Sequence, residues 1–150
     1  DQLISEAVEP VAVLAQAREV DFRYLTAPDV PSVFADAGLL GEAVYQMAHN
    51  AVKFNKPGGQ AQVRAFESDG WLTIEARDTG IGLTRDRLKL LGQPFEQHAD
   101  TLRRGREGLG VGWAFVGYVA HVHYGRTHVS SPGPDKGSTF GITLPIVPES

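Results

Sequence analysis

The sequence predicts a single α/β domain, because segments with helical spacing and segments with strand spacing follow one another along 150 residues. Apolar residues recur with helical spacing in residues 5–20 and 39–54, and they alternate with polar residues in residues 60–67 and 71–78. With 42% apolar residues, the chain can bury one core of useful size. The 17 glycines and 9 prolines indicate many turns between these elements.

Composition excludes several classes of protein. The net charge of −4 gives no overall basic field for nucleic acid, and the absence of cysteine excludes disulfides and thiolate metal sites. No apolar run approaches the roughly 20 residues of a membrane helix, and no signal-peptide pattern opens the chain. We therefore expect a cytoplasmic fragment without membrane contact, although a longer parent protein can be membrane-anchored.

The first third of the chain reads as scaffold. Residues 5–20 have the apolar spacing of a helix, and residues 21–25 alternate like a short strand. A loop with two prolines, Pro28 and Pro31, separates this strand from a short apolar piece at residues 33–35.

Residues 39–54 predict an amphipathic helix with a polar face of particular interest. Gln46, Asn50 and Lys53 are spaced four and three residues apart and would share that face. An amide oxygen suits a hard cation such as Mg²⁺, and an ammonium group suits phosphate. A solvated helix face is the alternative, and Pro57 with the two following glycines ends the helix. The opposite, apolar face consists of Leu40, Val44, Met47 and Ala51.

Residues 60–67 and 71–78 predict an antiparallel hairpin that ends on Asp78. Gly80 and Gly82 follow at once, so the backbone can pass close to a ligand without intervening Cβ atoms. A carboxylate at this strand end suits a ligand with an N–H donor, such as the amino group of adenine. A solvated turn is the alternative, because Asp-Thr-Gly is ordinary turn chemistry.

A short helix is predicted around residues 85–91, and the segment that follows to residue 108 has little periodicity. Six of the 14 basic residues fall between Arg85 and Arg106, including Arg103 and Arg104. A long loop with a basic cluster fits either a lid over phosphates or a solvated loop.

Alternate glycines open the next predicted helix, which extends to about residue 123. Glycines at this position allow backbone N–H groups and the positive helix end to approach phosphate. The spacing differs from GxGxxG and from the P-loop, so neither a dinucleotide fold nor a Walker ATPase is indicated. Residues 127–131 and 138–144 predict a second hairpin. The run that opens the helix is Gly108, Leu109, Gly110, Val111 and Gly112.

Together, the polar helix, Asp-x-Gly-x-Gly, Gly-x-Gly-x-Gly and a final Gly-Ser-Thr-Phe resemble the catalytic, ATP-binding domain of bacterial sensor histidine kinases. That domain belongs to the wider GHKL group with gyrase, Hsp90 and MutL, and the resemblance covers residues 36–145. It implies a two-layer α/β sandwich, with a mixed sheet of about five strands covered on one face by three helices. It also implies ATP and Mg²⁺ as cofactors and an ATP lid over residues 83–108.

The resemblance assigns roles to individual positions. Asn50 is the expected Mg²⁺ ligand, Lys53 a phosphate contact, and Asp78 the acceptor for the adenine amino group. One of the lid residues Arg103, Arg104 and Arg106 would contact the γ-phosphate. The remaining expected nucleotide contacts are Gln46, Gly80, Gly82, Phe95, Gly108, Leu109, Gly110, Val111, Gly112, Ser138 and Thr139.

Gln46 departs from the family pattern. It stands where the family commonly has asparagine and where hydrolysing members have a glutamate base. An amide cannot act as a general base, so phosphotransfer is favoured over hydrolysis. Gln46 and the unusual run Trp113-Ala-Phe also leave open a degenerate domain that serves as an interaction module in signalling.

None of the five histidines has the context of a phosphoacceptor, which the family carries on a separate helical hairpin. We therefore expect that hairpin outside this chain, as the first partner, with a response-regulator receiver domain as the second. Without the hairpin the domain would be inactive toward histidine, and it should be monomeric. A metal cluster of His121, His123 and His128 is not expected, because His121 and His123 do not share a helix face.

Overall fold

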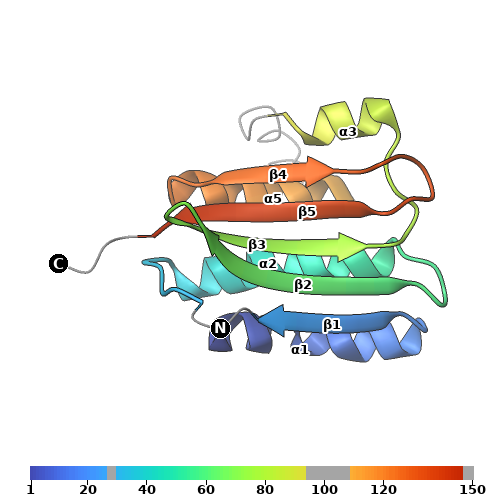
Figure 1. The fold of residues 1–150 in the computed structure, drawn as a ribbon, viewed down its shortest axis with the longest axis horizontal. Coiled ribbons are helices and arrows are strands. Elements are labelled where there is room, and N and C mark those ends of the chain that lie inside the picture. The colour runs from blue at the N-terminus through green and yellow to red at the C-terminus, as the bar shows by residue number, and fades with distance from the viewer. Residues whose placement is uncertain (27–29, 94–108, 147–150) are drawn as a thin grey trace.

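In a computed structural model, which describes residues 1–26, 30–93 and 109–146, the chain forms one five-stranded sheet (Figure 1). The strand order is β1-β2-β3-β5-β4, with β1 parallel to β2 and every other neighbouring pair antiparallel. The predicted mixed sheet of about five strands is therefore confirmed. The strands are β1 (Asp21–Thr26), β2 (Gln60–Ser68), β3 (Trp71–Asp78), β4 (Arg126–Ser130) and β5 (Ser138–Pro145).

Both predicted hairpins are present. The turn between β2 and β3 consists of Asp69 and Gly70, whose φ angles are +53° and +82°. Two consecutive residues in the left-handed region match the twist of the flanking strands, which explains the short connection. The register pairs Asp78, the last residue of β3, with Ser138, the first residue of β5. The sheet therefore brings these two predicted site residues together.

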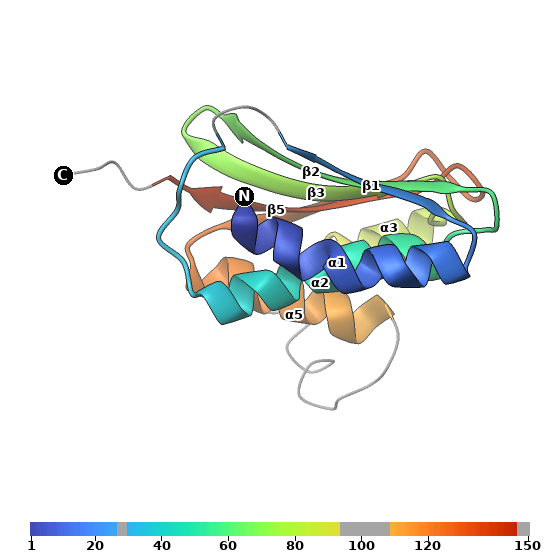
Figure 2. The same ribbon diagram turned by 90° about the horizontal axis from the view of Figure 1, so that it is seen from below.

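Three helices from the described part of the chain cover one face of the sheet, as the resemblance implied (Figure 2). A fourth, short helix lies beside the β4 edge (Figure 1), so the count of three holds only for the covering layer. The covering helices are α1 (Gln2–Ala17), α2 (Ala37–Lys53) and α5 (Leu109–Val122), and the edge helix is α3 (Arg85–Leu91). Within the three described ranges, no helix has the length and apolar character needed to cross a bilayer.

The core lies between the helices and the covered face of the sheet. The predicted apolar stripe of α2 is buried there, which confirms the helical spacing in the sequence. The largest side chains without solvent exposure come from α1, α2, α5 and the three central strands: Val11, Val44, Val52, Val63, Ile74, Val116, Val119, Ile142 and Leu144.

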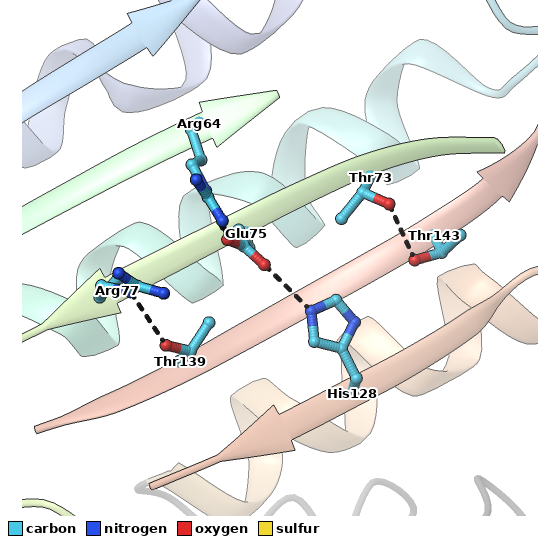
Figure 3. A network of polar contacts seen from close by, with 7 residues as sticks. All are labelled: Arg64, Thr73, Glu75, Arg77, His128, Thr139 and Thr143. Atoms are coloured by element: carbon cyan, nitrogen blue, oxygen red, sulfur yellow. Dashed lines mark hydrogen bonds and ion pairs between the residues drawn. The ribbon is translucent and has the colours of Figure 1, made fainter. Parts of the chain in front are cut away.

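On the other face of the sheet lies no helix of the described ranges, and polar side chains cover its middle (Figure 3). Arg64 donates from Nε to Glu75 Oε1, and His128 Nε2 lies 3.3 Å from Glu75 Oε2. The His128 ring reaches across β5 because Gly141 has no side chain; a Cβ there would lie 2.1 Å from the ring. We call Arg64, Glu75 and His128 the open-face triad.

Candidate functional site

A cavity of about 370 Å³ opens at the end of β3, between α2, β5 and the loop that leads to α3. It brings together four residues that the sequence predicted from three separate segments: Asn50, Asp78, Gly82 and Ser138. The other lining residues are Phe54, Ile81, Leu83, Thr84, Arg87, Pro134 and Phe140.

Asp78 is the buried acceptor of this cavity. Its Oδ1 accepts from the Gly80 backbone N–H at 2.8 Å, and its Oδ2 accepts from the Ser138 hydroxyl at 2.9 Å. Burial raises the pKa of Asp78, while these hydrogen bonds act in the opposite direction. The donors that contact the carboxylate are therefore neutral, and its two oxygens keep acceptor capacity for a ligand.

The glycines after Asp78 have a packing role that the sequence did not reveal. A Cβ on Gly80 would lie 2.3 Å from the Phe54 carbonyl oxygen, and one on Gly82, where φ is +66°, would lie 2.1 Å from that of Gly133. The N–H of Ile81, between them, donates to the Phe54 carbonyl at 3.1 Å. The loop is thus pressed against the end of α2 and the β4–β5 turn, which shapes the cavity.

Asn50 and Gln46 lie on the side of α2 that faces α5. Asn50 is buried and lines the cavity, whereas Gln46 does not line it and donates from Nε2 to Glu42 at 2.9 Å. A Cβ on Gly112 would lie 2.7 Å from Gln46 Oε1 and 3.4 Å from Asn50 Nδ2. Because α5 begins at Leu109, Gly112 lies within its first turn and lets the two helices approach closely.

Two expected contacts lie away from the cavity. Lys53 is exposed, and its Nζ lies 5.5 Å from the centroid of the Phe54 ring. The Thr139 hydroxyl lies on the open face of the sheet, 3.4 Å from Nε of Arg77 (Figure 3). Nucleotide contacts by these two side chains remain predictions.

The expected lid residues Phe95, Arg103, Arg104 and Arg106, together with Gly108, fall outside the described ranges. Leu109, Gly110 and Val111 belong to the first turn of α5, of which the backbone alone is described. Their contacts with a nucleotide remain predictions.

Sequence reasoning missed the apolar and α3 parts of the lining. Phe140 could have been found from period two, since it points to the same side of β5 as Ser138. Trp113 stands behind it, with ring centroids 4.9 Å apart in an edge-to-face arrangement, and donates from Nε1 to the Leu91 carbonyl at 2.7 Å. Thr84 gives no signal in the sequence, and Arg87 was noted only as one of the six basic residues between Arg85 and Arg106. The tertiary position of α3 brings both to the cavity.

Two histidines near the helices, His49 and His123, are explained by their surroundings within the protein. Burial, and after it the positive charges of Lys53 and Arg18, lower the pKa of His49, so its ring stays neutral. His123 accepts at Nε2 from the Asp36 backbone N–H at 2.9 Å and links the start of α2 to the end of α5. Among the described residues, no group of three or more His, Asp or Glu side chains could hold a metal ion.

A protein-family model described as histidine kinase-, DNA gyrase B- and HSP90-like ATPase matches residues 35–148. The chain therefore belongs to this family of ATPases. Its cavity, with Asp78 at the strand end and Asn50 on the facing helix, lies within the matched region.

Similar proteins are histidine kinases. The chain is 32% identical over 146 residues to the histidine protein kinase DivJ of Caulobacter vibrioides, covering 97% of this chain and 24% of that protein. It is 30% identical over 149 residues to the sensor-like histidine kinase SenX3 of Mycolicibacterium smegmatis, covering 99% of this chain and 38% of that protein. The chain thus spans only about a quarter to two fifths of these relatives.

Solved structures agree with the fold. The mycobacterial sensor histidine kinase MprB matches with a TM-score of 0.77 and 28% identity, covering 99% of this chain and 95% of that one. Full-length ShkA in complex with AMPPNP matches with a TM-score of 0.79 at 24% identity, covering 99% of this chain and 30% of that one. At that identity, the second match supports the fold alone.

Proposed function

We propose that this chain is the catalytic domain of a two-component sensor histidine kinase, which binds ATP with Mg²⁺ and transfers the γ-phosphoryl group to a histidine on a separate hairpin. The observation that carries this proposal is the cavity in which buried Asp78, bonded only to neutral donors, faces Asn50. Family membership and the kinase relatives support it.

Three polar lining residues, Asn50, Asp78 and Ser138, have defined tasks in this proposal. Asp78 accepts a hydrogen bond from the adenine amino group, and Ser138 and Gly80 hold the carboxylate in place. The amide oxygen of Asn50 is the hard ligand that Mg²⁺ prefers, and the ion would complete its shell with phosphate oxygens and water. When bound, Mg²⁺ neutralises phosphate charge.

In this proposal the chain positions the nucleotide, and Gln46 does not supply a general base that would activate water for hydrolysis. Gln46 cannot remove a proton, and its side-chain amide is engaged with Glu42. Transfer to a better nucleophile, the imidazole of a partner hairpin, therefore fits this domain better than hydrolysis. A response-regulator receiver domain would then take the phosphoryl group, in a cytoplasmic complex.

Two departures from the family pattern, at Gln46 and at Trp113, favoured the alternative of a degenerate interaction module. The structure provides an explanation for the second. Trp113 was unusual in the sequence, but its indole has a local structural task, since it links the end of α3 to α5. Gln46 remains as the other departure from the family pattern.

Titration calorimetry with the non-hydrolysable analogue AMPPNP, with and without Mg²⁺, tests the proposal. We expect binding that Mg²⁺ strengthens, and we expect Asn50→Ala to remove most of this strengthening. Tyr45→Phe is a control on the same helix, because Tyr45 does not line the cavity and is not one of the expected nucleotide contacts. Absence of binding by the unmodified chain at millimolar AMPPNP would refute the kinase proposal and favour the interaction module.

A further inference from the structure

Arg87, on α3, is the one basic side chain among the described residues that line the cavity. The sequence placed the phosphate-binding arginines later, between residues 103 and 106. We propose that Arg87 contacts the phosphate groups of the bound nucleotide and sets the orientation in which the nucleotide binds. This inference rests on the proposed function of the same cavity.

The charge of Arg87 is not neutralised within the described part of the chain. Two other arginines in the same ranges have carboxylate partners: Arg23 pairs with Asp21, and Arg64 pairs with Glu75. Arg87 is exposed, and its backbone N–H donates to Thr84 Oγ1 at 3.2 Å, but its guanidinium has no such partner among these residues. Asp86 is its direct neighbour, and adjacent residues do not face each other on a helix. A guanidinium in this state is available to an anionic ligand.

The cavity lining carries side chains of opposite charge. Asp78 is a buried acceptor that would repel phosphate, whereas Arg87 would attract it. A nucleotide has an N–H donor at its base and negative charge at its phosphates. These two side chains therefore favour one orientation, with the base at Asp78 and the phosphates toward Arg87.

Helix α3 holds Arg87 in place because it is anchored at both ends. At its start, the Leu83 N–H donates to Ser131 Oγ at 3.1 Å and Thr84 caps the helix. At its end, the Leu91 carbonyl accepts the buried indole N–H of Trp113 at 2.7 Å. A guanidinium on an anchored helix loses less freedom on binding than one on a free segment.

Comparison of AMPPNP with adenosine tests this inference, because adenosine has the base and lacks the phosphates. We expect Arg87→Gln to weaken AMPPNP binding about tenfold and to leave adenosine binding within about twofold. Arg85→Gln is the matched control: Arg85 carries the same charge on the same helix, is exposed, and does not line the cavity. Calorimetry gives the AMPPNP affinity, ligand-observed NMR gives that of adenosine, and thermal unfolding verifies the fold of each variant.

An equal loss for both ligands would overturn the inference, since Arg87 would then act on the base or on the cavity as a whole. An unchanged AMPPNP affinity would also overturn it, as would an equal loss in Arg85→Gln, which would indicate a general field of α3. Failure of the proposed function is distinguishable, because the unmodified chain would then not bind AMPPNP at all.

Discussion

Strand β3 carries two buried carboxylates, Glu75 and Asp78, on opposite faces of the sheet. Their exposed fractions are nearly equal, at 6% and 7%. Glu75 has the Arg64 guanidinium and the His128 ring as its partners, whereas Asp78 has backbone N–H groups and one hydroxyl. Burial therefore does not distinguish the two. The nature of the partners does, because the Arg64 guanidinium compensates the charge of Glu75 within the protein, whereas only neutral donors contact Asp78.

The largest expected difference between the two carboxylates is in nucleotide affinity. Asp78→Asn should lower the affinity for AMPPNP about 100-fold, because an amide presents a donor where the adenine amino group needs an acceptor. Glu75→Gln should leave that affinity within about twofold. Calorimetry on both variants measures the contrast, and a comparable loss in the two would contradict the assignment of Asp78 as the ligand-binding carboxylate.

Stability should respond in the opposite order. Glu75→Gln removes the charge that Arg64 and His128 share, and we expect it to cost about 2 kcal/mol of unfolding free energy. The value is below that of a fully buried pair because the Arg64 side chain is 43% exposed and can be solvated. Urea unfolding measures it. A loss as large in Asp78→Asn would show that both carboxylates are structural.

Gly141→Ala tests how the open-face triad is assembled. The new Cβ would meet the His128 ring, so the ring must turn away from Glu75, and we expect a cost of about 1 kcal/mol. In a His128→Ala background the same substitution should cost nothing, since the clash is absent. An equal cost in both backgrounds would contradict the contact between ring and strand.

The smallest effect concerns pH. Because burial raises the pKa of Asp78, the folded chain retains this proton to higher pH than the unfolded chain does. Ionisation of Asp78 therefore lowers stability as the pH rises from its ordinary pKa through the raised one, and no such loss exists below both. Asp78→Asn should be slightly more stable than the unmodified chain at about pH 7, and this gain should disappear below about pH 4. A gain independent of pH would contradict the raised pKa.

Much of the fold was accessible from the sequence, because period-two alternation sets the hairpins and helical spacing sets α2. Asn50, Asp78 and Ser138 converge because α2 and the register of β3 with β5 bring their segments together. Thr139 lies on the open face because adjacent residues of a strand point to opposite sides of the sheet. Its side chain is therefore on the other side of β5 from that of Ser138.

The remaining features of the site depend on packing that no local pattern encodes. Arg87 reaches the cavity because distant residues anchor α3, among them Ser131 and Trp113. The sequence indicated close approach of Gly82 to a ligand, whereas its nearest neighbour is the carbonyl of Gly133, 51 residues further along the chain.

The edge-to-face contact of Trp113 with Phe140 gives the cavity an optical reporter. Trp113 is 3% exposed and touches a lining residue, while the other tryptophan of the chain, Trp71, lies on β3 beneath Arg126. The fluorescent indole of Trp113 is therefore separated from the cavity by one aromatic ring, that of Phe140. Its emission should therefore shift when the cavity fills, and a Trp71→Phe chain would show that shift without background from the second fluorophore.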